Sequence, residues 1–305
     1  MAKLVAIVGP TGIGKTKLAI QLGLRFNGEI VNADSRQIYC YMDIGTAKPT
    51  KDELASVPHH LVDIIEPNQE FSLPEYQKLA NDAIQDIQSR GKVPFLVGGS
   101  GLYIWALLEG WVVPKVAPDL TFRRGLEKKA EIGQGAELYQ KLQQVDPAAA
   151  EKIDPHNVRR VIRALEVNKL TDKKFSQLQK KRPPPFKSLI IGLTANRTEL
   201  YHRADERVDN MIKYGFVEEV KKLLKMGYSL SLPAMSGIGY REIGQFIQGE
   251  MTQDEAIYKI KTGTHRFIRH QYAWFRLKDE RIKWFDAEKM AEEEIEKTVE
   301  EFLKT

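Results

Sequence analysis

The chain has 305 residues, enough for two domains of ordinary size, and its hydrophobic share of 42% and charged share of 29% are typical of folded globular proteins. A disulfide-stapled scaffold and a cysteine-based zinc site are excluded, because Cys40 is the single cysteine. The apolar run at residues 4–8 is too short for a signal peptide or a membrane span, so we expect a cytoplasmic protein without membrane association.

The net charge of +5 is distributed unevenly along the chain. Residues 112–188 hold seventeen lysines and arginines against nine acidic residues, and residues 259–285 hold eight against two. Residues 286–305 have the opposite balance, with eight acidic and three basic residues. Clusters of positive charge attract polyanions, but basic helix faces are often only solvated, so charge alone leaves nucleic-acid binding open.

The first hundred residues alternate between strand-like and helical patterns. Short apolar runs that end in glycine, proline, aspartate or asparagine predict strands, and amphipathic stretches between them predict helices. This alternation is typical of an α/β fold with a parallel sheet covered on both faces, where ligands bind at the carboxyl ends of the strands. The predicted strands are 4–8, 29–33, 60–65 and 93–97, and the predicted helices are 16–26 and 73–90.

Strand signals disappear after residue 111, where prolines punctuate stretches rich in alanine, glutamine, glutamate and lysine with helical spacing. We therefore expect residues 1–111 to form the first part of the core, residues 112–187 to form a helical insertion, and residues 188–305 to complete the core. A strand at 188–193 should re-enter the sheet. Helices are predicted at 198–226, 239–248 and 252–277, and an acidic helix should end the chain.

Residues 9–16, Gly-Pro-Thr-Gly-Ile-Gly-Lys-Thr, match the pattern G-x-x-x-x-G-K-[ST] between a predicted strand and a predicted helix. In such a phosphate-binding loop (P-loop), glycines let backbone N–H groups turn toward phosphate oxygens, and the helix N-terminus adds its positive dipole end. Lys15 supplies a charge and the Thr16 hydroxyl can bind Mg²⁺. The pattern predicts a site for a diphosphate or triphosphate, formed by Gly9, Pro10, Thr11, Gly12, Ile13, Gly14, Lys15 and Thr16.

Two further polar residues follow predicted strands. Asp34 comes directly after the strand at 29–33, where a carboxylate binds metal, accepts a proton or caps a helix. Ser100 belongs to the glycine-rich turn at 97–103, which either brings backbone close to a ligand or is only a tight turn. These alternatives remain open from position alone.

Two later helices carry charged and aromatic side chains at helical spacing. Arg203 and Arg207 are four residues apart and share one face, where surface ion pairs with Glu199 and Asp209 and a bound anion are alternatives. In the helix predicted at 252–277, we expect an apolar face to pack inward and a basic face to point outward. The inward positions are Phe267, Ile268, Tyr272 and Phe275, and the outward ones are Arg266, Arg269 and Arg276.

The ordered motifs of the chain resemble those of the bacterial tRNA dimethylallyltransferases, also called tRNA isopentenyltransferases, over essentially its whole length. The resemblance begins with the P-loop and continues with D-S-R-Q-I-Y at 34–39, M-D-I-G-T-A-K-P at 42–49 and P-H-H-L-V-D at 58–63. Several long motifs in one order make a chance match very improbable. Later matching blocks are residues 97–103, 163–167, 207–211, 239–242 and 274–276.

The resemblance implies transfer of a dimethylallyl group from dimethylallyl diphosphate to the exocyclic amine of adenosine 37 of tRNA, next to the anticodon, giving N6-(dimethylallyl)adenosine and diphosphate. The implied catalytic residues are Asp34 as the base, Ser100 at the position of a family threonine, and Arg207 on the departing diphosphate. Mg²⁺ is the implied cofactor, held directly or through water by Thr16 and Ser100. We expect a monomer that binds dimethylallyl diphosphate and the tRNA anticodon stem-loop.

By the same resemblance, tRNA contacts are spread over the core and the insertion. Arginines, with aromatics such as Tyr240 and Tyr272, suit single-stranded loops because they bind phosphates and stack on splayed bases. The implied contact residues are Asp34, Ser35, Arg36, Gln37, Ser100, Arg123, Arg159, Arg160, Arg163, Gly239, Tyr240, Arg241, Arg269 and Arg276.

Two other functions compete with this interpretation. A P-loop kinase for a small molecule would use Asp34 to bind metal or the acceptor alcohol and Gly98-Gly99 to hold the acceptor, but it needs no basic helical insertion. A non-catalytic RNA-binding nucleotide switch would prefer ATP or GTP. The transferase should instead bind dimethylallyl diphosphate and be inhibited by pyrophosphate.

Overall fold

A computed structural model describes residues 2–114, 116–117, 119–178, 180–289 and 291–305. The chain divides into two compact units. The first comprises Met1–Leu108 and Pro184–Thr305, and the second comprises Glu109–Pro183. The second unit is therefore an insertion within the sequence of the first, and the sequence pattern predicts 112–187 for it.

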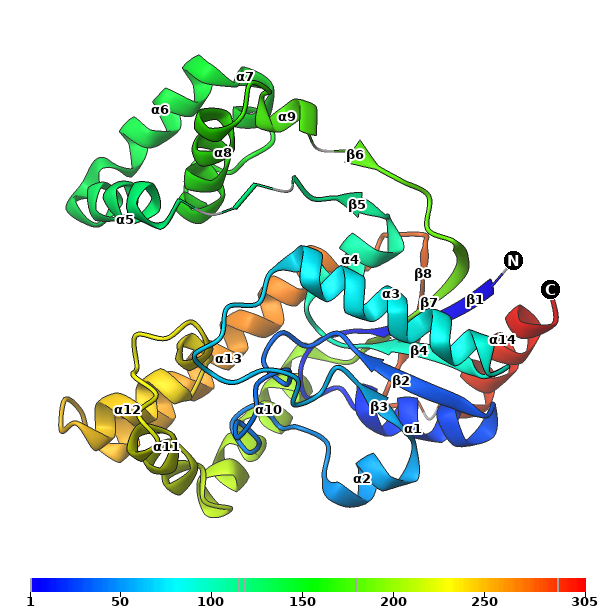
Figure 1. Cartoon of the computed structure of the whole chain (residues 1–305). Helices are drawn as coiled ribbons and strands as arrows, with labels where there is room; N and C mark the ends of the chain where they lie inside the picture. The colour runs from blue at the N-terminus through cyan, green and yellow to red at the C-terminus, as the bar shows by residue number, and fades with distance from the viewer. Residues whose placement is uncertain (1, 115, 118, 179, 290) are drawn as a thin grey trace. The chain divides into compact units, whose positions relative to one another are not determined.

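The first unit is built on a six-stranded sheet in which all neighbouring strands are parallel (Figure 1). Its strands are β1 (Ala2–Val8), β2 (Gly28–Asn32), β3 (His59–His60), β4 (Val93–Val97), β7 (Phe186–Thr194) and β8 (Ile282–Asp286). The order is β3-β2-β4-β1-β7-β8. This topology confirms the predicted α/β parallel core, and β7, which follows the insertion, pairs with β1 along the whole length of β1.

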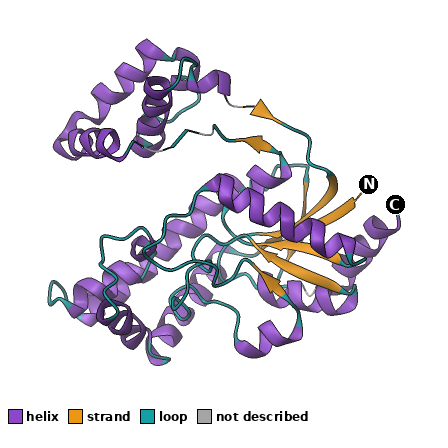
Figure 2. Cartoon of the chain, in the orientation of Figure 1, coloured by secondary structure: helices purple, strands orange, loops and turns teal. Residues whose placement is uncertain are grey.

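Helices cover both faces of this sheet, with α1 and α3 on opposite sides (Figures 1 and 2). Leu18 and Leu22 of α1 join one apolar cluster with Val5 and Ile7 of β1. On the other face, α3 buries Tyr76 and three aliphatic residues at helical spacing. The helices of this unit are α1 (Lys15–Arg25), α2 (Lys51–Ser56), α3 (Leu73–Ser89), α4 (Gly101–Leu108), α10 (Arg197–Lys213), α11 (Phe216–Lys225), α12 (Tyr240–Ile247), α13 (Gln253–Trp274) and α14 (Glu292–Lys304), with a 3₁₀ turn at Ala234–Ser236.

Two predicted elements of this unit differ from the structure, and one strand of the structure was not predicted. The helix predicted at 198–226 is two helices, because Gly215 takes a φ of 97° and ends the first one in the left-handed conformation. The strand predicted at 60–65 stops at His60, because Leu61 and Asp63 both have positive φ and cannot continue a strand. Strand β8 was not predicted from the sequence and pairs with β7 at the sheet edge.

The second unit is helical, with a short antiparallel ribbon between its two ends. Its helices are α5 (Leu120–Lys129), α6 (Gly135–Val145), α7 (Pro147–Ala150), α8 (Val158–Leu170) and α9 (Phe175–Leu178), and a kinked turn at Ala130–Gln134 joins α5 to α6. The ribbon pairs β5 (Trp111–Val112) with β6 (Lys180–Lys181). Buried leucines of α5, α6 and α8 form a core of its own. Within the described residues, no helix combines the length and the apolar character that crossing a bilayer requires.

A buried glutamate joins β2 to its surroundings. The Glu29 carboxylate is 2% exposed and lies 2.7 Å from His60 Nε2. It accepts hydrogen bonds from Arg90 Nη2 and Lys92 Nζ, both at 2.7 Å. The hydrogen bonds from Arg90 outweigh the opposing effect of burial and hold the pKa of Glu29 well below its usual range. The cluster thus links β2 to β3 and to the connection between α3 and β4.

Glu29→Gln is expected to lower the free energy of unfolding by about 3 kcal/mol near neutral pH, because it removes the charge that Arg90 and Lys92 neutralise. Since the folded pKa is lowered, the wild-type contribution is full above the ordinary glutamate pKa of 4.5 and is lost as the pH falls toward the folded value. Urea unfolding at about pH 7 and about pH 3 measures the difference in free energy of unfolding between wild type and Glu29→Gln. This difference should be smaller at the lower pH. Glu70→Gln, at an exposed position, is the control. An equal difference at both pH values would contradict the claim that the ionised Glu29 carboxylate stabilises the fold.

Candidate active site

The P-loop connects the end of β1 to the start of α1, at the carboxyl edge of the sheet. Gly14 precedes the helix with a φ of 96°, a conformation that favours glycine. At Gly9, with a φ of 143°, an added Cβ would lie 2.6 Å from the carbonyl oxygen of Leu193 on β7. The loop therefore has the strand–turn–helix context that its sequence pattern requires.

Lys15 lies against its own loop. Its Nζ donates hydrogen bonds to the carbonyl oxygens of Gly9 at 3.0 Å and Pro10 at 2.8 Å. Burial lowers the pKa of Lys15 to about 8, while the Asp34 carboxylate acts to raise it and the Arg207 guanidinium acts to lower it further. A bound anion would offset the cost of burying this charge.

Two cavities meet at the carboxyl edge of the sheet. The P-loop cavity has a volume of about 430 Å³, and the aromatic cavity has a volume of about 450 Å³. Gly14, Lys15, Thr16 and Gln37 line the first, whereas Ser100, Phe267 and Trp274 line the second. Five residues line both cavities: Thr11, Gly12, Asp34, Thr46 and Arg207.

Asp34 follows the end of β2 and is half-buried between the two cavities. Its Oδ1 accepts the N–H of Arg36 at 2.8 Å, and its own N–H donates to Oδ1 of Asn32 at 3.0 Å. A turn follows Asp34 instead of a helix, so the helix-cap alternative is wrong and the carboxylate closes a turn. The same contacts hold the carboxylate at the junction of the cavities.

Ser100 is joined to this turn from the neighbouring strand β4. Its Oγ accepts the N–H of Ser35 at 3.0 Å, and its N–H donates to the carbonyl oxygen of Ala33 at 3.2 Å. A Cβ added at Gly98 would lie 2.2 Å from that carbonyl oxygen, and one added at Gly101 would lie 2.3 Å from the Trp274 ring. These glycines therefore let segments of the protein itself approach closely.

The two arginines of α10 have different surroundings. Arg203 donates to the Glu199 carboxylate at 2.7 Å, as in the ion-pair alternative. Arg207 Nη1 donates to Thr11 Oγ1 at 3.3 Å, and its side chain lines both cavities. Burial lowers the pKa of Arg207 and the Asp34 carboxylate opposes this effect. Both arginines line the P-loop cavity, but only Arg207 also lines the aromatic cavity, and only Arg203 is paired with a carboxylate of its own helix.

In the turn that follows Asp34, the side chains of Arg36 and Gln37 hold other loops in place. Arg36 donates to the carbonyl oxygen of Pro233 at 2.8 Å and to Ser236 Oγ at 3.2 Å. Gln37 Nε2 donates to the carbonyl oxygen of Ala47 at 3.0 Å. Both side chains also line a cavity, Arg36 the aromatic one and Gln37 the P-loop one.

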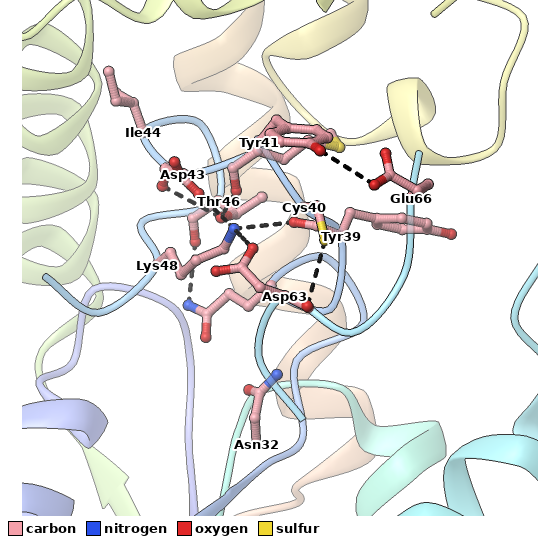
Figure 3. A network of polar contacts seen from close by, with 12 residues as sticks. Asn32, Tyr39, Cys40, Tyr41, Asp43, Ile44, Thr46, Lys48, Asp63 and Glu66 are labelled. Carbon is pink, nitrogen blue, oxygen red and sulfur yellow. Dashed lines mark hydrogen bonds and ion pairs between the residues drawn. The ribbon is translucent and has the colours of Figure 1, made fainter. Parts of the chain in front are cut away.

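Lys48 is the centre of the polar network in Figure 3, and its side chain is only 4% exposed. Its Nζ contacts the carboxylates of Asp43 and Asp63 and donates to the carbonyl oxygen of Tyr39 at 3.0 Å. The network holds the loop that brings Thr46 to both cavities. Neither Thr46 nor Lys48 was assigned a role from the sequence, although both belong to the motif M-D-I-G-T-A-K-P.

The stacking role considered for Tyr240 is wrong, because its ring is 1% exposed in the core around α11 and α12. Its hydroxyl donates to Glu219 Oε1 at 2.7 Å, and burial followed by the Glu219 charge raises its pKa. Gly239 directly precedes α12 with a φ of 99°, and Arg241 is exposed. Of this block, therefore, Arg241 presents a charged group to solvent.

Helix α13 ends at Trp274, before the predicted end at residue 277, and only partly follows its predicted faces, so Phe275 and Arg276 lie just after it. Ile268 and Phe275 are buried as expected, and Tyr272 is half-buried with its hydroxyl 3.0 Å from Thr194 Oγ1. Phe267 is 38% exposed and, with Trp274 at 41%, lines the aromatic cavity, so the inward position predicted for it is wrong. The outward basic face is confirmed for Arg266, Arg269 and Arg276.

In the second unit, the four arginines implied as tRNA contacts fall into two groups, one paired with a buried carboxylate and one exposed. Arg123 and Arg163 both pair with the buried carboxylate of Glu166, which also accepts the N–H of Asp119 at 2.8 Å. Burial opposes ionisation of Glu166, but the hydrogen bonds from the two arginines lower its pKa. The other two, Arg159 and Arg160, are exposed on α8.

Two family models and several named relatives match long stretches of this chain. The family model described as IPP transferase matches residues 37–278, and the model described as isopentenyl transferase matches residues 2–64. A tRNA dimethylallyltransferase of a Roseiflexus species is 53% identical over 277 residues, which is 90% of this chain and 90% of the relative. One of Dehalococcoides mccartyi is 49% identical and covers 99% of this chain and 93% of the relative.

Solved structures give the same result. The full-length tRNA isopentenylpyrophosphate transferase of Bacillus halodurans superposes with a TM-score of 0.75 at 40% identity, covering 100% of this chain and 97% of that one. A eukaryotic dimethylallyltransferase acting on tRNA superposes with a TM-score of 0.77 at 30% identity, covering 94% of this chain and 74% of that one. Because the IPP transferase model matches most of the chain and these relatives align along almost all of it, the protein belongs to the tRNA dimethylallyltransferase family.

Proposed function

We propose that the protein transfers a dimethylallyl group from dimethylallyl diphosphate to the exocyclic amine of adenosine 37 of tRNA, releasing diphosphate. The observation that carries this proposal is the junction of the two cavities, where Asp34 and Arg207 line both. A diphosphate on the P-loop and a nucleobase entering the aromatic cavity would meet at this junction. Relatives named for the same reaction support transfer over the kinase and the nucleotide switch.

The chemistry needs charge stabilisation on one side and a base on the other. The new bond joins the amine nitrogen to the allylic carbon, while the bond from that carbon to the diphosphate oxygen breaks and leaves its electron pair on the diphosphate. Lys15, Arg207 and the P-loop N–H groups would stabilise this growing negative charge. Asp34 would accept the amine proton, which matters because the lone pair of the amine is delocalised into the adenine ring.

The residues of the P-loop cavity suit Mg²⁺, which prefers oxygen ligands. The Thr16 hydroxyl and the Asp34 carboxylate both line this cavity, and we propose that Thr16 binds the ion together with diphosphate oxygens. Ser100 lines the aromatic cavity instead, and its Oγ already contacts Ser35. Bound Mg²⁺ would supply positive charge beside the leaving diphosphate.

The anticodon stem-loop is the proposed RNA partner, and exposed arginines would bind its phosphates. These are Arg159 and Arg160 in the second unit and Arg241, Arg269 and Arg276 in the first. Arg123 and Arg163 form ion pairs with Glu166 in the structure, so truncating them would leave a buried carboxylate without these charged partners. The RNA contact of the second unit is therefore assigned first to Arg159 and Arg160.

Replacing both Arg159 and Arg160 with alanine should weaken tRNA binding and reduce the slope of log K against log salt by one to two, because about one counterion is released per phosphate contact. Titrations of tRNA at several salt concentrations measure both quantities. The double variant Lys289→Ala/Lys297→Ala, at exposed positions of the acidic C-terminal region, removes the same charge and should change neither. An unchanged affinity and slope in the arginine variant would reject the assignment.

The function itself is tested by incubating the protein with tRNA, Mg²⁺ and dimethylallyl diphosphate, followed by mass spectrometry of the nucleosides. N6-(dimethylallyl)adenosine at position 37 is the expected product, and pyrophosphate should inhibit its formation. ATP should remain intact throughout. ATP hydrolysis coupled to product formation would favour the kinase or the switch instead.

A further inference from the structure

Gln271 is a polar residue of α13 that is only 2% exposed and has both ends of its amide occupied. Its Oε1 accepts the N–H of Thr11 at 2.8 Å, and its Nε2 donates to the carbonyl oxygen of Gly99 at 3.1 Å. One partner can only donate and the other can only accept, so the orientation of the amide is determined. A single side chain from the last third of the sequence thus bridges two glycine-rich loops.

The two bridged loops carry the groups on which the proposed reaction depends. Thr11 belongs to the P-loop, and its hydroxyl accepts the hydrogen bond from Arg207. Gly99 precedes Ser100, whose Oγ holds the N–H of Ser35 beside Asp34. The amide therefore links the anion-binding side of the junction to the side that holds the carboxylate.

The fit of this bridge is close. A Cβ added at Gly99 would lie 2.2 Å from Gln271 Nε2, so the turn accommodates the amide only because residue 99 is glycine. Three residues further along α13, Trp274 is packed in the same way against Gly101. Buried amides with both polar groups paired resist displacement, because any other arrangement leaves a donor or an acceptor without a partner.

We propose that Gln271 is a positioning residue that holds the P-loop and the Ser100 turn in register, so that Arg207 and Asp34 act on the same reacting atoms. This inference rests on the proposed function for its effect on turnover. Its effect on diphosphate binding does not, because the P-loop binds a diphosphate in any of the functions considered.

The test uses the protonation state of a substituted side chain. In Gln271→Glu, the ionised carboxylate can accept the N–H of Thr11 but cannot donate to the carbonyl oxygen of Gly99. The neutral carboxyl can do both and so restores the bridge. Burial raises the pKa of such a carboxyl, and the neutral form gains population as the pH falls. Gln271→Met keeps a similar volume but makes neither bond and does not titrate.

At each pH, the turnover of Gln271→Glu is divided by that of wild type, and its pyrophosphate affinity is divided by that of wild type. We expect both ratios to rise about tenfold as the pH falls from about 8 to about 6. Taking the ratio at each pH removes the titration of groups that both proteins share, including Lys15, and that of pyrophosphate itself. Gln271→Met should be impaired at every pH with a constant ratio. The matched control Gln248→Glu makes the same chemical change at an exposed position and should follow wild type.

A constant ratio for Gln271→Glu, or both Gln271 variants within about twofold of wild type, would overturn the proposal. Thermal unfolding of each variant shows that the compared proteins are folded. If wild type binds pyrophosphate but forms no product, the proposed function fails, while the pyrophosphate ratio still decides the role of Gln271.

Discussion

Asp34→Asn is expected to slow the chemical step about 10²-fold or more while tRNA affinity stays within several-fold of wild type. The amide cannot take the proton of the adenine amine. Binding of tRNA is spread over many phosphate contacts, so one substitution at the junction removes little of it. Single-turnover kinetics with saturating dimethylallyl diphosphate and tRNA titrations measure the two effects separately.

The structure makes this substitution a clean test of the base. The asparagine oxygen can still accept the N–H of Arg36, which Asp34 Oδ1 accepts at 2.8 Å, so the turn stays closed. Asp34→Ala removes this contact as well as the base. Comparing the two variants therefore separates the role of Asp34 as a base from its role in closing the turn. If closing the turn were the main role of the residue, Asp34→Asn would be nearly normal and Asp34→Ala would be slow. A near-normal chemical step in Asp34→Asn would therefore remove Asp34 from the mechanism.

Lys15→Met is expected to lower kcat/KM for dimethylallyl diphosphate about 10²-fold, because it removes a positive charge that stabilises the departing diphosphate. The effect should depend on pH. The pKa of Lys15 is lowered to about 8, so the wild-type advantage in pyrophosphate binding is full below that pH and shrinks above it as the ammonium loses its proton. Calorimetric titration of both proteins with pyrophosphate across this range gives the difference directly.

Lys17→Met is the control for Lys15, because Lys17 is on the same helix, two residues further along, with an exposed side chain. It should bind pyrophosphate like wild type at every pH. If the difference in pyrophosphate affinity between Lys15→Met and wild type stays constant from about pH 7 to about pH 10, the charge of Lys15 is not what binds the anion.

Local patterns in the sequence predicted the parts of the site that a short segment determines. The P-loop is one such part, because its glycines, lysine and threonine act within eight consecutive residues after a strand. The strand at 93–97 was predicted with the bounds that β4 has, since its apolar run is bounded by a glycine on each side of the segment. Asp34 was found for the same reason, as the polar residue that follows a buried strand.

Contacts between distant segments were beyond such patterns. The edge strand β8 exists because β7 offers it a partner, and its five residues carry too short a signal alone. Tyr240 and Phe267 had similar aromatic signals and both line the aromatic cavity, yet Tyr240 is 1% exposed in the core beside α11 whereas Phe267 is 38% exposed. The resemblance implies Arg163 as a tRNA contact, and only the structure shows that it and Arg123 both pair with the buried carboxylate of Glu166.

The sequence by itself determined the P-loop motif in its strand–turn–helix context, the α/β core and the existence of a basic helical insertion, because each depends on residues that are neighbours along the chain or on the average charge of a segment. Only the tertiary structure decided which groups meet at the junction of the two cavities. Arg207 reaches Thr11 across 196 positions and Gln271 reaches it across 260, and which side chains close such contacts is settled by packing and hydrogen-bond geometry that no local pattern encodes.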